Sequence, residues 1–221
     1  WHVLQKMLPD FQGKRVLDLG CGFGWHCQYA IEHGAVHALG IDLSHKMLEE
    51  ATKRNNSPHI EYKCMAIEDF DYIPESYDIV ISSLTFHYLE LFPDICKKVH
   101  RCLTPGGTFV FSVEHPVFTA YGSQDWFYDK QRNILHWPVD NYFYPGARRT
   151  LFVGCEVVKQ HHTLSQILGG LLRAGFALTA VEEARPSEDA LAHIPGMADE
   201  MRRPMMLLVR AEKASPAGAN L

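Results

Sequence analysis

Residues 16–25 read Val-Leu-Asp-Leu-Gly-Cys-Gly-Phe-Gly-Trp, and this stretch decides the fold. Its apolar start predicts a short buried strand, its alternating glycines predict a tight loop, and residues 25–33 predict a helix. Glycine suits such a loop because it allows sharp turns and lets a ligand approach more closely than a Cβ would permit. A strand that turns on glycines into a helix N-terminus is typical of a nucleotide cradle, since its free backbone N–H groups point outward.

The spacing of the glycines and a downstream acid narrow the choice of ligand. A dinucleotide fingerprint needs a glycine three residues after the second one, but Trp25 stands there and Gly24 comes one residue early. This spacing argues against a dinucleotide site. Asp42 ends a second apolar strand about 20 residues beyond the glycines, where such folds place the acid that accepts from ribose hydroxyls. The alternative is that Asp42 caps the following helix, a role that Ser44 could take instead.

Strands and helices alternate along most of the chain. Strands are expected at 15–19, 38–42, 60–65, 77–84 and 108–113, and helices at 1–8, 25–33, 44–54 and 91–103. A helix at 164–174 and two further strands at 176–182 and 204–212 complete the pattern, the last two joined by a polar loop. This alternation predicts a parallel sheet covered by helices on both faces, hence one α/β domain spanning 1–221. The small-residue tail at 214–221 is expected to fray.

Residues 114–163 interrupt the alternation. A loop of this length in a compact domain is usually functional or disordered, and this one is too aromatic for disorder. We interpret it as a lid and substrate pocket over the carboxyl ends of the strands, the alternative being a satellite core that covers the sheet edge. The alternation over 151–159 indicates strands within it. Its aromatic residues are Phe118, Tyr121, Trp126, Phe127, Tyr128, Trp137, Tyr142, Phe143, Tyr144 and Phe152.

Composition limits the classes of partner. The formal net charge is −5, and basic residues come as isolated pairs, whereas nucleic-acid binding usually needs a continuous basic face. No apolar stretch is long enough to span a bilayer, and no secretory signal precedes the first strand. Six scattered cysteines without a Cys-x-x-Cys pair are expected to stay reduced. We therefore expect a cytoplasmic protein with a small-molecule substrate, no nucleic-acid partner and no membrane partner.

These motifs together resemble class I S-adenosylmethionine-dependent methyltransferases. Residues 18–24 and Gly-Ile-Asp-Leu-Ser at 40–44 are similar to motif I and to the acid of the second strand, and residues 77–84 and 103–108 match the downstream motifs. The resemblance covers roughly residues 14–113 and is strongest to the small-molecule branch related to ubiquinone and menaquinone biosynthesis (type 11). It implies S-adenosyl-L-methionine as cofactor and S-adenosyl-L-homocysteine as product. It also implies a Rossmann-like three-layer sandwich, with a mostly parallel seven-stranded sheet, an antiparallel last strand and a lid inserted after strand five.

The resemblance also implies a set of cofactor-binding residues. The glycine loop would contact the amino-acid end of the cofactor with an acid beneath it, Asp42 would take the ribose hydroxyls, and the residues after strands two and three would hold the adenine. In one departure, this chain has Ala66 where many relatives carry an Asp that accepts from the adenine amino group. Glu68 or Asp69 must then supply this acceptor. The alternative is that both are simply the exposed start of a short helix. The implied residues are Asp18, Gly20, Cys21, Gly22, Gly24, Asp42, Leu43, Met47, Ala66, Ile67, Glu68 and Ser83.

Candidates for catalysis lie near the ends of the fourth and fifth strands. Residues 83–88 lack the acidic or Asn residue with two prolines that methylases of adenine or glutamine nitrogens carry. His87 and His115 are the candidate catalytic residues, with His161 and His162 as alternatives. His161 and His162 are adjacent, but the sequence places no carboxylate or helix-spaced ligand with them, so no metal site is expected.

The type of acceptor atom stays open at this point. A general base is needed only when the acceptor arrives protonated, so methylation of oxygen, nitrogen or carbon is possible. Two other functions remain, a non-catalytic S-adenosylmethionine-binding module and a nicotinamide-dependent oxidoreductase. The oligomeric state is not predicted.

Overall fold

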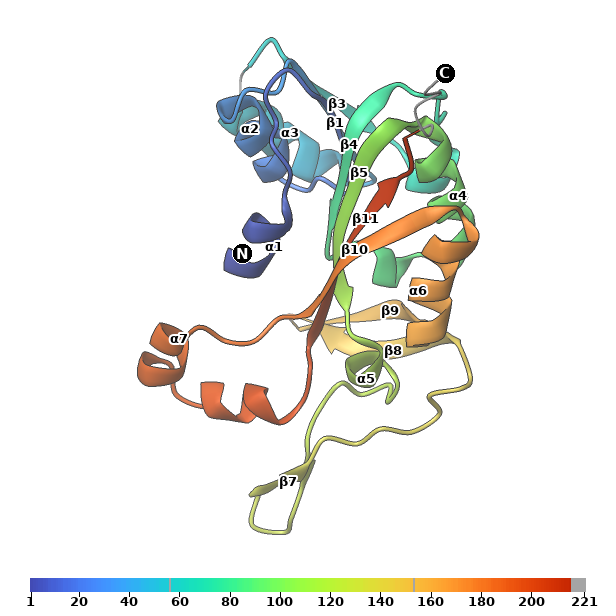
Figure 1. The fold of residues 1–221 in the computed structure, drawn as a ribbon. Coiled ribbons are helices and arrows are strands. Elements are labelled where there is room, and N and C mark those ends of the chain that lie inside the picture. Colours follow the sequence, from blue (N-terminus) through green and yellow to red (C-terminus); the bar gives the residue numbers. More distant parts are fainter. Residues whose placement is uncertain (56, 153, 216–221) are drawn as a thin grey trace.

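A seven-stranded sheet forms the centre of the computed structural model, which describes residues 1–55, 57–152 and 154–215 (Figure 1). The strand order is β10-β11-β5-β4-β1-β2-β3. β11 runs antiparallel to both of its neighbours, β10 and β5. All other neighbouring strands of this sheet are parallel. The expected mostly parallel sheet with an antiparallel last strand is confirmed. Its strands are β1 (Arg15–Leu19), β2 (His37–Asp42), β3 (Ile60–Cys64), β4 (Tyr77–Ser83), β5 (Leu103–Glu114), β10 (Phe176–Glu183) and β11 (Met206–Lys213).

Helices cover both faces of this sheet, which gives the expected three layers (Figure 1). One face carries α1 (His2–Met7), α2 (Trp25–Glu32) and α3 (His45–Arg54), and the other carries α4 (Phe92–Cys102) and α6 (Leu164–Arg173). Two short 3₁₀ helices, η1 (Ile67–Asp69) and η2 (Phe86–Tyr88), follow β3 and β4.

Burial of alternate strand residues on the two faces explains the layering. Leu17 of β1 belongs to the larger core beneath α4 and α6, whereas Val16 belongs to the core beneath α2 and α3. A third cluster joins α1 to the sheet through Leu4, Met7 and Val110. Because both faces of the central strands are buried, they read as continuous apolar runs. Asp18 is the exception in β1, with no exposed surface.

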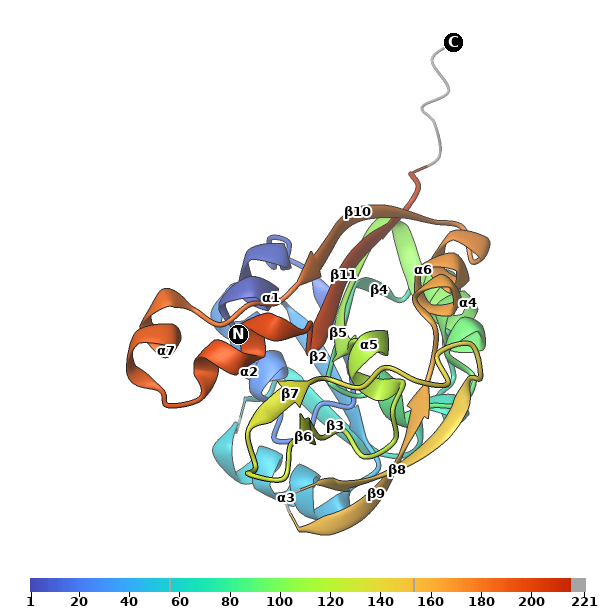
Figure 2. The ribbon, with the colours of Figure 1, turned by 90° about the horizontal axis from the view of Figure 1, so that it is seen from below.

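Residues 114–163, for which the expected name lid is kept as a label, follow β5 and contain two antiparallel hairpins. The strands that were expected over 151–159 are present, since β8 ends at Phe152 and β9 begins at Cys155. Figure 2 views the molecule from the end at which β5 finishes and shows the lid hairpins spread across that end. The elements of the lid are α5 (Pro116–Thr119), β6 (Phe127–Tyr128), β7 (Ile134–His136), β8 (Gly146–Phe152) and β9 (Cys155–His161).

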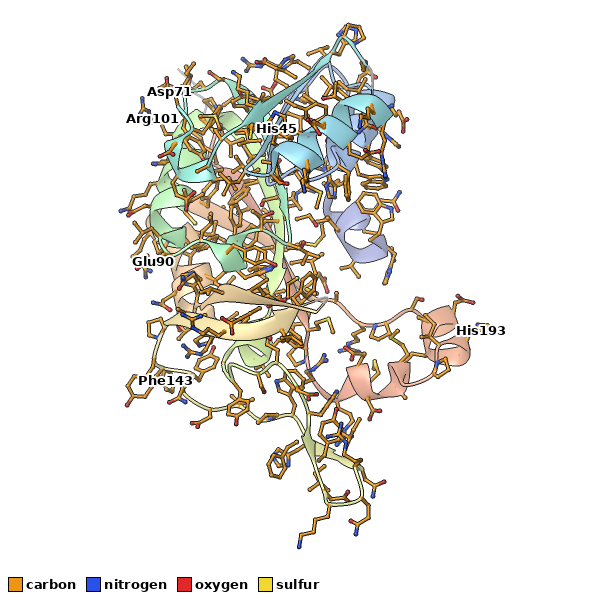
Figure 3. The ribbon with its side chains drawn as sticks, turned by 180° about the vertical axis from the view of Figure 1, so that it is seen from behind. His45, Asp71, Glu90, Arg101, Phe143 and His193 are labelled. Atoms are coloured by element: carbon orange, nitrogen blue, oxygen red, sulfur yellow. The ribbon has the colours of Figure 1, made fainter. Side chains whose placement is uncertain are left out.

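A second insertion, residues 184–205, separates β10 from β11. The polar composition of this segment predicts a loop, but the structure contains α7 (Glu188–His193) and η3 (Met197–Arg202). Ser187 caps α7 by accepting a hydrogen bond from the Ala190 amide at 3.1 Å, and Glu188 and Asp189 lie in the first turn. These are ordinary N-terminal helix signals that the sequence analysis overlooked. Figure 3 labels His193 on α7 and Phe143 in the lid.

Arg203 joins the second insertion to the lid. Its guanidinium carbon lies 4.3 Å from the ring centroid of Trp137, 4.7 Å from that of Phe118 and 5.1 Å from that of Trp126. Its Nη1 and Nη2 donate to the two carboxylate oxygens of Glu200, at 2.8 and 3.1 Å. Only 5% of the Arg203 side chain is exposed. The buried cation therefore fastens three lid aromatics to the segment before β11.

The remaining expectations concern the chain terminus and the membrane. Of the tail expected to fray at 214–221, residues 216–221 lie outside the described residues. Among the helices of the described chain, none has the length and apolar character required to cross a bilayer.

Candidate active site

The three glycines of the loop after β1 all have positive φ, but they differ in what surrounds them. A Cβ on Gly20 would lie 2.1 Å from the hydroxyl oxygen of Thr85, and one on Gly24 would lie 2.0 Å from that of Tyr62. A Cβ on Gly22 would meet no atom of the described part of the chain within 4 Å. Gly20 and Gly24 are thus required for close packing, whereas Gly22 borders open space on the exposed side of the loop.

Asp42 connects the end of β2 to the glycine loop. Its Oδ2 accepts a hydrogen bond from the Gly22 amide at 2.8 Å, and its Oδ1 accepts one from the Ser44 amide at 2.8 Å. Ser44 is the N-cap of α3 and accepts from the Met47 amide at 3.4 Å. The capping role therefore belongs to Ser44, which leaves Asp42 beside the loop. The Met65 amide donates to the Asp42 carbonyl at 3.1 Å, which brings the segment after β3 to the same place.

The residues expected around the adenine ring gather near Asp42. Leu43 is 74% exposed and Met47 is 37% exposed, so both apolar side chains are accessible to a ligand. Ala66 directly precedes η1, in which Ile67 is buried and Glu68 is exposed. Two exposed apolar side chains and the start of a short helix therefore lie together at one edge of the loop.

Asp18 lies beneath the loop and is fully buried. Its Oδ1 has no hydrogen-bond partner among the described residues. Its Oδ2 lies 3.7 Å from the Cys27 sulfur and 3.9 Å from Nδ1 of His26, both in α2. Burial raises the pKa of the Asp18 carboxyl to about 7, because the ionised form is poorly solvated there. An incompletely satisfied acid therefore faces the base of the loop.

A cavity of about 420 Å³ adjoins α2 directly after the loop. Its walls are largely apolar and come from separate parts of the chain, among them Trp1 and Leu4 at the N-terminus, Trp25 at the start of α2, Leu84 after β4 and Leu208 in β11. The Trp1 and Trp25 rings meet edge to face at 4.2 Å between centroids. The N-terminal segment thus closes one side of the cavity.

Polar groups in this cavity are few. Ser83 and Ser112 line it, and their hydroxyl oxygens lie 3.1 Å apart. His26 also lines it, and burial lowers the pKa of this imidazole to about 4, which keeps it neutral at pH 7. His26 was not predicted, although its place in the first helical turn after Gly24 is a signal that could have found it.

Comparison with known proteins identifies the family. A family model described as a methyltransferase domain matches residues 17–111. A crystal structure of a protein assigned as an S-adenosylmethionine-dependent methyltransferase from Listeria monocytogenes is 53% identical, covers 97% of this chain and 96% of that one, and superposes with a TM-score of 0.93. The chain belongs to the S-adenosylmethionine-dependent methyltransferases.

Two further relatives support this assignment. The S-adenosylmethionine-dependent methyltransferase of Mesorhizobium loti is 41% identical over 96% of this chain and 97% of that one, with a TM-score of 0.89. A ubiquinone biosynthesis O-methyltransferase of Neisseria meningitidis serogroup C is 36% identical over 110 residues, which are 47% of this chain and 45% of that one. The chain thus spans about half the length of that curated relative.

The described site fits the cofactor of this methyltransferase family. Among the described residues, none fills the side of Gly22 that lacks a Cβ, and none donates to the buried Oδ1 of Asp18. The family assignment makes the chain an S-adenosylmethionine-dependent enzyme and sets aside the nicotinamide alternative.

His87 of the methyltransferase is buried in η2, and 3% of its surface is exposed. Its Nδ1 accepts a hydrogen bond from the Glu114 amide at 3.4 Å. Burial lowers the pKa of His87 to about 4. The negative charge of Glu114 raises this pKa and the positive charge of Lys159 lowers it, so these two effects oppose one another. The ring is therefore neutral at pH 7, and because Nδ1 accepts, Nε2 carries the proton. His87 is not among the residues that line the 420 Å³ cavity.

Beside His87 lies a buried ion pair that the sequence analysis did not predict. The Lys159 ammonium donates to Oε1 of Glu114, and the exposed fractions of the two side chains are 2% and 7%. Gln124 completes the network, since its Nε2 donates to Oε2 of Glu114 at 2.7 Å and its Oε1 accepts from Lys159 at 2.9 Å. The two contacts of Glu114 therefore join the end of β5 to the lid.

The other candidate, His115, has hydrogen bonds at both ring nitrogens. Nδ1 accepts from the Val117 amide at 3.1 Å and thereby caps α5, and Nε2 lies 3.0 Å from a carboxylate oxygen of Glu183. His115 lines a separate opening of about 600 Å³ next to β10. The structure therefore does not bring His87 and His115 together in one cavity.

His161 and His162 are also engaged by other groups. Nδ1 of His161 lies 2.7 Å from the Thr119 hydroxyl and its Nε2 lies 2.9 Å from the Tyr142 carbonyl oxygen. Nε2 of His162 lies 2.8 Å from the Leu89 carbonyl oxygen. These contacts fasten the end of β9 to α5, to the lid and to the segment after η2, so the two histidines act as structural ties.

Proposed function

We propose that this methyltransferase acts on a small molecule, whose acceptor atom enters the 420 Å³ cavity beside the glycine loop. The observation that carries this proposal is the size and the largely apolar lining of the cavity, which the N-terminal segment and Trp25 bound on one side. The cofactor supplies a methyl group that is already activated for in-line displacement. Alignment of the acceptor and exclusion of water are then the main tasks of the protein.

We assign the cofactor contacts as follows. Asp42 accepts from the ribose hydroxyls, since its position between Gly22 and Ser44 holds both of its oxygens at the loop. Asp18 receives the cofactor ammonium, which would supply the donor that its Oδ1 lacks. The loop residues Gly20, Cys21, Gly22 and Gly24 hold the amino-acid end by their backbone, and the remaining predicted contacts, at the adenine ring and the end of β4, are Leu43, Met47, Ala66, Ile67, Glu68 and Ser83.

For the two histidines we propose positioning roles. A neutral His87 whose Nδ1 accepts the Glu114 amide can donate from Nε2, but it can act as a base at Nε2 only after its tautomer changes and that hydrogen bond breaks. His115 holds the start of α5 and the Glu183 carboxylate. We therefore expect transfer that needs no proton uptake by either ring.

Calorimetric titration with S-adenosylmethionine, S-adenosylhomocysteine and NADH tests the cofactor assignment. We expect both sulfur compounds to bind, with affinities in the micromolar range, and NADH not to bind. Transfer of a radiolabelled methyl group to a panel of small molecules then separates an active enzyme from a module that only binds the cofactor. Binding of NADH alone, or of none of the three compounds, would contradict the proposal.

A further inference from the structure

We propose that Asn55, the residue that ends α3, is a positioning residue of the cofactor site. It fixes the peptide between Phe23 and Gly24, so that the amide of Phe23 is presented to the amino-acid end of the cofactor. This inference rests on the proposed function and adds two groups to it, the Asn55 side chain and the Phe23 amide. Asn55 is the C-cap of α3, at the end of the helix opposite to the Ser44 cap.

The Phe23 amide is the one donor of the glycine loop that the protein does not use. Four of the five amides at residues 20–24 donate to the carbonyl oxygens of Ile41 and Cys21 or to the Asp42 carboxylate. The fifth amide, that of Phe23, has no acceptor within the described part of the chain. A backbone N–H group binds a carboxylate through a charge-assisted hydrogen bond, and the amino-acid end of the cofactor carries a carboxylate. The orientation of Phe23 therefore matters for this contact.

Asn55 holds the carbonyl group of this same residue. Its Nδ2 donates to the Phe23 carbonyl oxygen at 2.9 Å and to the Tyr62 hydroxyl oxygen at 3.3 Å, which uses both of its hydrogens. The other end of the peptide unit is also held, because the Gly24 amide donates to the Cys21 carbonyl oxygen at 2.8 Å. The peptide between Phe23 and Gly24 is thus tied on both sides, to α3 and within the loop.

The same end of α3 also contacts the Phe23 ring. The guanidinium carbon of Arg54 lies 4.9 Å from the centroid of this ring, and 43% of Phe23 is exposed. Phe23 stands between Gly22 and Gly24, which both have positive φ. Glycine loses more conformational freedom on ordering than any other residue.

Contacts that order such a loop before the ligand arrives reduce the entropy that binding costs. Asn55 and Arg54 hold the loop through Phe23, on the side of α3, whereas Asp42 holds it through the Gly22 amide. We therefore expect Asn55 to strengthen cofactor binding through the backbone of the loop.

Two ligands separate this positioning role from a general loss of structure. S-Adenosylhomocysteine carries the amino-acid end, whereas methylthioadenosine has the same nucleoside without it. We would measure the affinity of both by titration calorimetry for the unaltered protein, for Asn55→Ala and for the isosteric Asn55→Asp. Both variants should bind S-adenosylhomocysteine about fivefold to tenfold more weakly, the value of one hydrogen bond, and methylthioadenosine within about twofold of the unaltered protein.

Tyr62→Phe is the matched control. It removes the second acceptor of Asn55 Nδ2 and leaves the hydrogen bond to the Phe23 carbonyl oxygen in place. Its affinity for S-adenosylhomocysteine should therefore stay within about twofold of that of the unaltered protein, since the value of the hydrogen bond to Phe23 is retained. Circular dichroism checks that each variant is folded.

Three results would each overturn the inference. The first is an unchanged affinity of Asn55→Ala for S-adenosylhomocysteine, and the second is an equal loss of affinity for both ligands, as a general disordering would give. The third is an equal loss in Tyr62→Phe, which would show that Asn55 acts through Tyr62. Failure of the unaltered protein to bind S-adenosylhomocysteine would contradict the proposed function instead.

Discussion

Oδ2 of Asp42 accepts the backbone amide of Gly22 at 2.8 Å, so that the acid of the second strand and the middle glycine of the loop form one unit. The carboxylate therefore has two tasks: it orders the loop, and in our proposal it binds the ribose. Asp42 is not needed as the cap of α3, because Ser44 caps that helix. This division of roles allows the contribution of Asp42 to cofactor binding to be measured.

Asp42→Ala should weaken S-adenosylmethionine binding by about 1–3 kcal/mol, through the loss of charge-assisted hydrogen bonds. Titration calorimetry gives the affinity, and circular dichroism checks that the fold persists. Glu50→Ala, which removes an exposed acid from α3, is the control and should bind normally. An Asp42→Ala affinity equal to that of the unaltered protein would remove this residue from the site.

Gly22→Val should abolish cofactor binding, because its side chain would fill the open side of the loop. Gly13→Val is a closely matched control: Gly13 also has a positive φ, and a Cβ there also meets no atom within 4 Å. The two variants should lose similar stability from backbone strain, whereas only the first should lose binding. If both bound S-adenosylhomocysteine equally well, the open side of Gly22 would not be the cofactor side.

The buried Asp18 should make stability depend on pH. Its carboxyl keeps a proton up to a pKa of about 7 in the folded state, against 3.8 ordinarily, so the folded state binds more protons between these values. The free energy of unfolding contributed by Asp18 therefore falls as pH rises from about 4 to about 7. His26 and His87, with lowered pKa values, act in the opposite direction.

Comparison with Asp18→Asn isolates the contribution of that carboxyl. Urea unfolding at pH 5 and pH 8, without cofactor, should show that the variant gains stability relative to the unaltered protein as pH rises. An identical pH dependence in the two proteins would show that Asp18 is ionised throughout this range.

Lys159→Met should destabilise the fold by about 3–5 kcal/mol, because the Glu114 charge is then buried without its partner. Adding Glu114→Gln should restore a large part of that loss. Lys97→Met, which breaks the exposed pair with Asp94, is the control and should cost at most about 1 kcal/mol. Chemical denaturation gives the free energy of unfolding of Lys159→Met, of the double variant and of Lys97→Met. A small effect of Lys159→Met would indicate that water reaches the Glu114 carboxylate.

Arg203→Met should cost about 2 kcal/mol through its lost contacts with the lid rings. It should also increase proteolytic cleavage in the lid and in residues 184–205 together. Arg203→Lys retains the charge but not the planar stacking, so its stability and its cleavage rate should lie between those of Arg203→Met and the unaltered protein. Cleavage that rises in only one of the two segments would show that they are held independently.

The sequence predicted the sheet because its evidence is local. The apolar strands, the glycine turn at Gly20–Gly24 and the cap at Ser44 each determine structure within a few residues. The place of Asp42 at the end of β2 was predictable for the same reason, since it follows from the local sequence. Boundaries differed by only one or two residues at most elements, although β5 begins at Leu103, five residues before the expected start.

What the sequence did not reveal depends on distant contacts. Lys159 reads as an ordinary polar residue of an alternating strand, and only its approach to Glu114 and Gln124 explains its burial. Trp1 borders the cavity because α1 folds back onto the sheet, which no local pattern shows. One of the two partners of His115, Glu183 at Nε2, likewise lies far along the chain.

The cation at Arg203 also bears on how this enzyme can be re-engineered. Phe118, Trp126 and Trp137 belong to the lid, but the side chain that they enclose comes from the other insertion, more than sixty residues later in the chain. A lid transplanted alone from a relative would present an aromatic box with nothing inside it. Chimeras of this scaffold should therefore exchange residues 114–163 and 184–205 as a single cassette.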